Sequence, residues 1–187
     1  MQTEALEGGF SDPAIQSARA FRGVMSAMAC PGQIERIEGA APPAPLSPAA
    51  GTVLLTLCDA DTPLYLAGAA DCAAVRQWIA FHIGAPLTGP GHCAFAVGTW
   101  DALMPLAAYP VGTSEYPDRS ATLIVECDRL EQSGATLSGP GIRTTTQLSL
   151  PETAAFADNR ALFPLGLDFI FTCGSDVAAL PRTTEVR

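Results

Sequence analysis

Two consecutive segments decide the fold of this chain: Phe163–Gly174 (FPLGLDFIFTCG) and Val177–Thr184 (VAALPRTT). Both are apolar enough to be buried strands, and the short Gly-Ser-Asp connection favours a turn that folds the second strand back beside the first. Asp168 stands inside the first strand, where an unpaired carboxylate would carry a large desolvation cost or a shifted pKa. The hairpin therefore predicts Arg182, at the end of the second strand, as the partner of Asp168.

Helices and strands alternate ahead of this hairpin. Helices are predicted from Asp12-Pro13 to Pro31-Gly32, from Ser47-Pro48 to Cys58, from Asp71 as N-cap to Gly84, and from Pro151 to about Leu162. Strands are predicted at 33–37, 64–67, 94–97, 121–125, 135–137 and 142–148, and exposed loops at 39–48 and 108–120. Helices and strands that alternate along the chain, with hairpins only near its C-terminal end, indicate an α/β fold with a mixed sheet. The length, residues 1–187, fits a single domain.

Charge and hydropathy exclude several classes of protein. The formal net charge is −9 and there is no basic stripe, so the chain is not expected to bind nucleic acid. No apolar run approaches the roughly 20 residues that a membrane-spanning helix needs. The first ten residues contain no base and resemble neither a secretory signal nor a transit peptide, so we expect a soluble cytoplasmic protein.

The chain contains no lysine, and its ten basic residues are all arginines. This excludes an internal Schiff base with pyridoxal phosphate (PLP), a Walker A loop and a lysine nucleophile. Its six cysteines form no C-x-x-C pair, and the two histidines lack the spacing of a local metal site. We therefore expect neither a resident metal nor PLP, and cysteines that act as small buried hydrophobes.

For a few polar residues, the sequence allows both a structural and a functional interpretation. Asp59, Asp61 and Thr62 surround a turn, and this pattern fits either a magnesium or general-base site or ordinary turn hydrogen bonds. His82, near the end of a helix, is either an acid–base group or a favourable partner of the helix dipole. These alternatives stay open at the level of sequence.

Two arginines are candidates for binding an anion. Arg143 follows the second Gly-Pro-Gly triplet by two residues, and a guanidinium binds oxyanions bidentately. Arg22 directly follows Phe21 on the first helix, where it serves an anion, an interface or simply a solvated helix face. No G-x-S-x-G elbow is present, so motifs alone define no active site.

The chain resembles the H subunit family of the bacterial carbon–phosphorus lyase core complex. The matching stretches occur in order and cover nearly the whole chain: Ser17–Gly32, Val53–Pro63, Phe81–His82, Ala85–Leu87, Ala121–Ile124, Leu137–Ile142 and Phe163–Thr184. The last of these is the most specific. The loops at 39–48 and 108–120 are not part of the match.

The resemblance implies a three-layer α/β/α sandwich like the large domain of type I PLP-dependent transferases, but without the cofactor. It also implies a homodimer that assembles with the G, I and J subunits, to which nucleotide-binding-cassette proteins attach. The complex forms α-D-ribose 1-methylphosphonate 5-triphosphate from ATP and methylphosphonate in phosphonate catabolism, and a transferase and a lyase step belong to the pathway. The later radical cleavage needs an iron–sulfur subunit, and this chain lacks a cysteine triad for such a cluster.

The resemblance thus favours a structural or regulatory subunit over an independent catalyst. The alternatives are an independent enzyme, or a ligand-binding regulator, that acts on phosphorylated small molecules. The polar residues within or beside matched stretches form the candidate ligand-binding or buried polar cluster: Arg22, Asp59, Asp61, Thr62, His82, Arg143, Asp168, Arg182 and Thr183.

Overall fold

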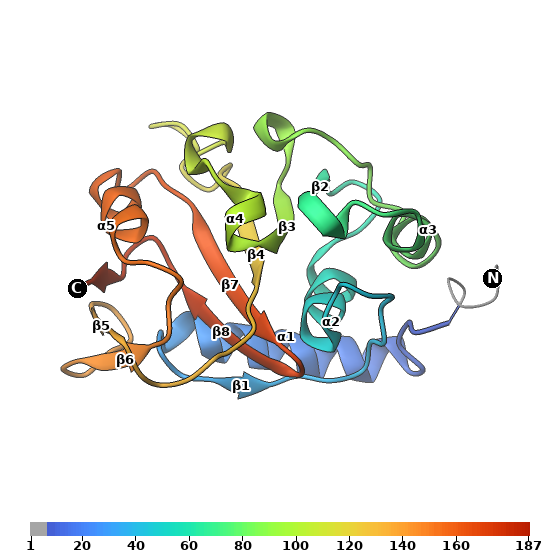
Figure 1. Ribbon diagram of the computed structural model, residues 1–187, viewed down its shortest axis with the longest axis horizontal. Helices are drawn as coiled ribbons and strands as arrows, with labels where there is room; N and C mark the ends of the chain where they lie inside the picture. Colours follow the sequence, from blue (N-terminus) through green and yellow to red (C-terminus); the bar gives the residue numbers. More distant parts are fainter. Residues whose placement is uncertain (1–6) are drawn as a thin grey trace.

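The computed structural model describes residues 7–187, which are built around a six-stranded mixed sheet (Figure 1). In the order in which they neighbour one another, its strands are β1 (Glu35–Arg36), β8 (Asp176–Leu180), β7 (Asp168–Cys173), β4 (Thr122–Glu126), β3 (Phe95–Thr99) and β2 (Leu64–Leu66). The four strands from β7 to β2 are parallel, while β8 and β1 are antiparallel to their neighbours. The predicted α/β class and mixed sheet are confirmed.

The β7–β8 hairpin has the predicted form. Phe169 lies opposite Leu180 and Cys173 opposite Asp176, so the chain reverses across Gly174 and Ser175. Gly174 has a φ of +58°, a left-handed conformation that glycine adopts without steric cost. This hairpin places the antiparallel edge of the sheet next to its parallel centre.

A second sheet of three short strands lies beside the first. It consists of β5 (Ala135–Ser138), with β6 (Thr146–Leu148) and β9 (Glu185–Val186) antiparallel on either side. The predicted pairing across the second Gly-Pro-Gly triplet is confirmed, but β6 begins at Thr146, later than predicted. Residues 142–145 remain outside the ladder.

Within residues 7–187, five α-helices connect the strands: α1 (Pro13–Ala29), α2 (Pro48–Leu57), α3 (Ala73–His82), α4 (Trp100–Leu103) and α5 (Ala154–Ala161). The same part of the chain contains three single turns of 3-10 helix: η2 (Gly68–Ala70), η3 (Pro90–His92) and η4 (Leu106–Ala108). The first two helices begin at the predicted caps, since the side chains of Asp12 and Ser47 accept hydrogen bonds from backbone N–H groups of the first turn. None of the helices within residues 7–187 combines the length and apolar character that crossing a membrane requires.

Two predicted helix starts are wrong. Asp71 does not cap α3: the N-cap position is Cys72, and no side chain caps the helix. The turn η2 ends just before Asp71, and the Asp71 carboxylate instead binds the guanidinium of Arg76 with both oxygens. The helix predicted from Pro151 begins only at Ala154, with Thr153 at the N-cap position and no side-chain hydrogen bond capping it.

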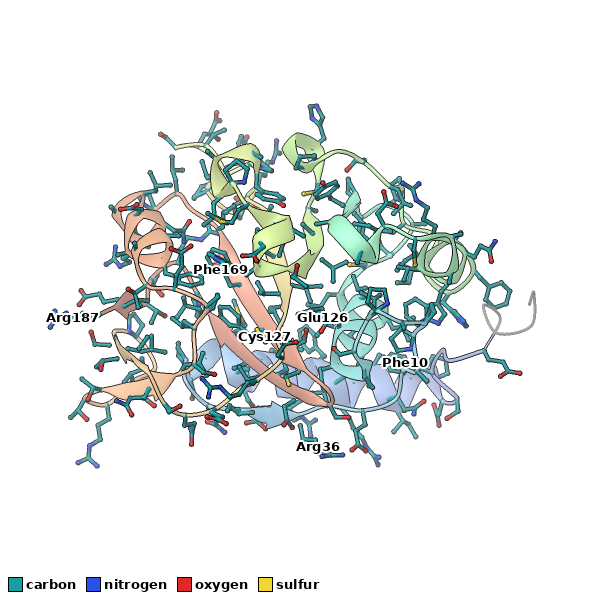
Figure 2. The ribbon with its side chains drawn as sticks, viewed as in Figure 1. Phe10, Arg36, Glu126, Cys127, Phe169 and Arg187 are labelled. Atoms are coloured by element: carbon teal, nitrogen blue, oxygen red, sulfur yellow. The ribbon has the colours of Figure 1, made fainter. Side chains whose placement is uncertain are left out.

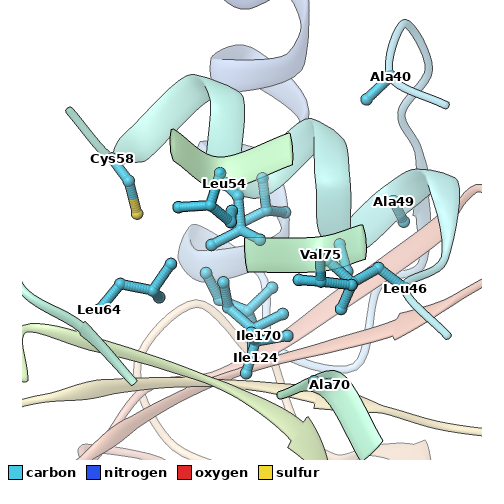
Figure 3. Packing of buried hydrophobic residues seen from close by; sticks show 14 of the residues in the cluster. Ala40, Leu46, Ala49, Leu54, Cys58, Leu64, Ala70, Val75, Ile124 and Ile170 are labelled. Atoms are coloured by element: carbon cyan, nitrogen blue, oxygen red, sulfur yellow. The ribbon is translucent and has the colours of Figure 1, made fainter. Parts of the chain in front are cut away.

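Helices cover both faces of the large sheet. On one face α1, α2 and α3 enclose a cluster in which Leu54 and Val75 face Ile124 and Ile170 of the strands (Figure 3). On the other face α4, α5 and the second sheet enclose an aromatic cluster with Phe156, Phe169 and Phe171. Both faces of the large sheet are therefore buried. Because side chains on either face must be apolar, β4 and β7 are continuous apolar runs and do not alternate with polar residues.

Candidate functional site

The structure does not gather the candidate residues into one site. Among them, Asp59 and Thr62 share one turn, in which the Asp59 carboxylate accepts hydrogen bonds from the Asp61 backbone N–H (3.0 Å) and the Thr62 hydroxyl (2.7 Å). These bonds hold the pKa of the Asp59 carboxyl below its ordinary value. The arrangement is the turn chemistry that the sequence offered as one alternative. Within residues 7–187, no group of three or more His, Cys, Asp or Glu side chains is arranged to hold a metal ion.

His82 is the last residue of α3. Its ring lies against Trp78 (5.2 Å between centroids) and Phe81 (4.8 Å). Its Nε2 atom lies 3.1 Å from the carbonyl oxygen of Glu7. These contacts tie the segment before α1 to α3, and they place His82 in a packing role.

Asp168 and Arg182 do come together, as predicted. One Asp168 oxygen accepts bonds from the Arg182 backbone N–H (2.8 Å) and Nε (3.2 Å), and the other lies 2.5 Å from Nη2. The guanidinium also donates to the Pro117 carbonyl oxygen (2.8 Å) and the Ser120 hydroxyl. The arginine thus clamps the loop at 108–120 to the amino end of β7, and Thr183 follows it in the chain without joining this network.

The side chains of the ion pair are only 13% (Arg182) and 19% (Asp168) exposed. Each of the three guanidinium nitrogens of Arg182 donates to a protein oxygen, so the fork that would bind an external anion is largely occupied by internal bonds. The pair is therefore a structural clamp rather than a binding site.

A cavity that the sequence did not predict lies at the carboxyl ends of the parallel strands. It has a volume of about 380 Å³ and is lined by Thr99 at the end of β3, Glu126 at the end of β4, the Trp100 side chain and Asp128. Figure 2 labels Glu126 and its neighbour Cys127 in the middle of the molecule. Ligands of open α/β sheets bind at this edge.

Glu126 is a partly buried ionisable group at this edge. Its Oε1 accepts a hydrogen bond from the Ser47 backbone N–H at the start of α2 (2.6 Å), and its Oε2 accepts one from the Thr172 hydroxyl (3.0 Å). Burial outweighs these bonds and raises the pKa of the Glu126 carboxyl above its ordinary value. A signal for it exists in the sequence: the residue is a carboxylate directly after the apolar run Ala121–Val125.

Replacing Glu126 with glutamine is expected to raise stability at pH 7 by about 1 kcal/mol, because the neutral amide avoids the desolvation cost. Its oxygen keeps the bond from Ser47, and the Thr172 hydroxyl, which also lies 3.3 Å from the Val125 carbonyl oxygen, turns to donate there. In the wild type, the pKa of the Glu126 carboxyl is higher in the folded than in the unfolded state. The protonated carboxyl therefore stabilises the fold at low pH, and this stabilisation is lost as pH rises through the folded-state pKa. The gain should therefore shrink from pH 7 to pH 4.5 in chemical unfolding curves, and a constant or growing gain would contradict the raised pKa.

The cysteines divide by their surroundings, and only part of the prediction about them is right. All six are free thiols, but only Cys58 and Cys93 are buried, while Cys30 is exposed. Burial raises the pKa of the Cys58 thiol to about 12 and that of the Cys93 thiol to about 11. Both thiols stay protonated at neutral pH, which removes the thiolate that a nucleophile needs.

The first helix carries an apolar surface. It buries its small residues Ala20 and Ala27 together with Val24, while Phe21 is 47% and Met25 55% exposed. These two side chains line an apolar groove of about 460 Å³, which we call the α1 groove; its other lining residues are Val24, Met28, Ala29, Leu57, Phe95, Thr122 and Ile170. Arg22 is exposed on the same helix and directly follows the groove residue Phe21 in the chain, but it does not itself line the groove.

Comparisons with known proteins place this architecture in a family. The sequence model described as "Bacterial phosphonate metabolism protein (PhnH)" matches residues 8–187. The chain is 41% identical over 196 residues to the "Alpha-D-ribose 1-methylphosphonate 5-triphosphate synthase subunit PhnH" of Rhizobium meliloti (strain 1021), covering 99% of this chain and 97% of that protein.

A second relative is the "Putative C-P lyase subunit protein HtxG" of Stutzerimonas stutzeri, 30% identical over 178 residues, with 89% of this chain and 84% of that protein covered. The family model and the first relative match nearly the whole chain, and the second relative matches 89% of it, so the similarity is not confined to one motif. The chain belongs to the family of bacterial phosphonate metabolism proteins described as PhnH.

Proposed function

We propose that this chain is a subunit of a complex that forms α-D-ribose 1-methylphosphonate 5-triphosphate from ATP and methylphosphonate. In that transfer the phosphonate oxygen forms a bond to C1 of the ribose while the bond to adenine breaks, so adenine is the leaving group. The similarity to a synthase subunit over 99% of the chain carries the proposal. The second relative, a putative carbon–phosphorus lyase subunit by its name, supports the same assignment.

The proposed role within the complex is structural or regulatory. The candidate polar residues are dispersed, and the buried ones satisfy one another, as the Asp168–Arg182 pair does. By the resemblance, the proposed partners are a second copy of this chain in a homodimer, the G, I and J subunits, and the nucleotide-binding-cassette proteins attached to them. We further propose a fold related to the large domain of type I PLP-dependent transferases, a cytoplasmic site of action where ATP is available, and function without bound PLP.

The α1 groove is the proposed contact with another subunit. Exposed aromatic and methionine side chains around an apolar groove are typical of protein–protein interfaces. Arg22 next to the groove is in no ion pair with any of residues 7–187, in a chain whose net charge is −9. The groove therefore fits an apolar segment with a carboxylate at its edge, contributed by a different subunit of the complex.

Replacing Phe21 with aspartate is expected to abolish retention of the other core subunits when the tagged chain is purified after co-expression with them. The change places a carboxylate at the apolar rim and removes an anchor, and both weaken a packed interface. Phe81→Asp is the matched control, because Phe81 is an exposed aromatic residue (59%) on α3. The control should keep the partners.

Three outcomes of the comparison between Phe21→Asp and Phe81→Asp would contradict the proposal or change it. Loss of partners with Phe81→Asp but not with Phe21→Asp would place the contact elsewhere and overturn the assignment of the α1 groove. A wild-type chain that stays separate from the co-expressed subunits would overturn the proposed function itself. A Phe21→Asp chain that keeps the other subunits but changes from dimer to monomer in light scattering would show that the groove binds a second copy.

The two alternative functions are separated by assays on the purified chain. Turnover of ATP and methylphosphonate by this chain alone, lost in a folded Arg182→Ala variant, would favour an independent enzyme. Thermal stabilisation by either ligand without turnover would favour a ligand-binding regulator. We expect no turnover by the chain alone and formation of the ribose triphosphate product only when the other subunits are present.

A further inference from the structure

A polar cavity of about 400 Å³ lies between the end of α1 and the β5–β6 connection. Its polar lining consists of Arg143, Thr144, Thr145, Thr146, Gln33 and Gln132. The cavity is separate from the α1 groove and from the cavity at the carboxyl ends of the parallel strands. Neither the proposed subunit contact nor the Asp168–Arg182 clamp uses it.

The charge of this cavity differs from that of the chain as a whole. Arg143 is the only charged residue of its lining, and no carboxylate lines it. Two carboxylates are close along the chain: Glu35 accepts a bond from the neutral Gln33 amide (2.5 Å) and keeps its charge, while Glu131 lies 3.8 Å from the Arg129 guanidinium. The lining itself thus carries one positive and no negative side chain in a chain of net charge −9, which favours an anionic ligand.

The arginine and two of the threonines of the cavity have uncommitted donors. Five of the ten arginines form ion pairs: Arg36, Arg76, Arg129, Arg182 and Arg187. Within residues 7–187, by contrast, the Arg143 guanidinium and the hydroxyls of Thr144 and Thr145 form no hydrogen bond with the protein. A fork of N–H groups next to several hydroxyls is the donor set that oxyanions prefer.

The backbone around these donors is held in place. Gly141 has a φ of +82°, and a Cβ there would collide with the carbonyl oxygen of Ala29 at the end of α1. The Ile142 N–H closes the turn on the Gly139 carbonyl oxygen (3.1 Å). On the other wall, Gln132 donates to the Gly32 carbonyl oxygen (2.9 Å). The donors therefore project from a turn docked against α1.

We infer that this cavity binds a phosphate or phosphonate group, with Arg143 bidentate to two of its oxygens and threonine hydroxyls donating to the oxygens that remain. A tetrahedral group with three terminal oxygens uses the guanidinium fork and the hydroxyls together, which a planar carboxylate does not. The oxyanion site follows from the geometry alone, and its restriction to phosphorus rests on the proposed function. A free phosphonate and the phosphate chain of a nucleotide share this chemistry.

The test is a titration of the ¹⁵N-labelled full chain with methylphosphonate, inorganic phosphate, tripolyphosphate and acetate, followed by amide chemical shifts. We expect shifts confined to residues 141–146 and to Gly32 and Gln33, saturating for the phosphorus anions and absent for acetate. Tighter binding of tripolyphosphate than of methylphosphonate would assign the site to a nucleotide phosphate chain, and the reverse order to the free phosphonate. Saturation by acetate at similar concentrations would overturn the phosphorus assignment.

Arg143→Ala is expected to weaken this binding about tenfold or more, because a charged hydrogen-bonding partner is lost. Arg19→Ala is the matched control: Arg19 is exposed on α1 and removes the same charge, and binding should change less than twofold. Equal weakening by both variants would show attraction by net charge only and overturn the site. Shifts mapping elsewhere in the chain would do the same.

The oxyanion site and the proposed function can be contradicted by different results. Arg143 is exposed, so the variant should keep the melting temperature of the wild type and still assemble with the other subunits. Binding that persists in a chain that does not join the complex would leave the oxyanion site standing without the proposed function. Assembly without any local shifts in the titration would remove the oxyanion site and leave the proposed function in place.

Discussion

Replacing Phe169 with alanine is expected to lower the free energy of unfolding by about 4 kcal/mol, as for other large-to-small changes of core phenylalanines. Phe169 is fully buried in β7. Its ring meets Phe156 of α5 edge-on at 4.9 Å between centroids, lies 6.2 Å from Trp100 of α4 and stacks on Phe171 at 6.3 Å. The substitution removes the common contact of two helices with the sheet and leaves a cavity.

Denaturant unfolding followed by circular dichroism measures this loss. Phe163→Ala provides the control, because Phe163 is 50% exposed and its ring contacts chiefly the Arg160 guanidinium, 5.0 Å away. Its loss should be below about 1 kcal/mol. A cost for Phe169→Ala below 2 kcal/mol would mean that the neighbouring rings collapse into the space, which would contradict a rigid aromatic cluster.

The parts of the fold that the sequence predicts are those with a local signal. The segment Phe163–Thr184 is a continuous apolar run, a glycine-containing turn and a second run, and each of these features acts over a few residues. The caps Asp12 and Ser47 are equally local, since each side chain bonds a backbone group three residues ahead. In each case the residues that form the sequence pattern are the same residues that make the contact, so these predictions are confirmed.

The parts that the sequence does not predict depend on residues far apart in the chain. Glu126 becomes partly buried because Ser47 at the start of α2, 79 residues earlier, and Thr172 of β7 both lie against the end of β4. The strand β9 exists only because β5 offers it an edge. Phe21, Val24 and Met25 recur at helical spacing in the sequence, but only packing in the folded chain decides that Val24 is buried while the other two are exposed.

The candidate site divides in the same way. The turn at 59–62 and the Asp168–Arg182 pair are the parts that the residues themselves indicated. Arg143 was identified by its type and by the turn before it, but its significance depends on the end of α1 and on Gln132 closing the cavity around it. The sequence predicted the donor, and the tertiary structure brings Gln33 and Gln132 to the same open cavity.

Replacing Arg182 with alanine is expected to lower the free energy of unfolding by about 3 kcal/mol, because it leaves the largely buried Asp168 carboxylate without its partner. The loop at 108–120 also loses the bonds from the guanidinium to the Pro117 carbonyl oxygen and the Ser120 hydroxyl. Hydrogen exchange should therefore accelerate in this loop. Arg187→Ala removes an exposed partner of Glu185 and should cost less than about 1 kcal/mol.

A second substitution distinguishes the causes of this loss. Asparagine at position 168 keeps an oxygen for the Arg182 backbone N–H but carries no charge. If the unpaired carboxylate is the main cost, the double variant Asp168→Asn/Arg182→Ala is more stable than Arg182→Ala by about 1 kcal/mol or more. If the double variant is no more stable, the lost bonds to the loop account for the effect, and Arg182 contributes chiefly by fixing the loop rather than by neutralising Asp168.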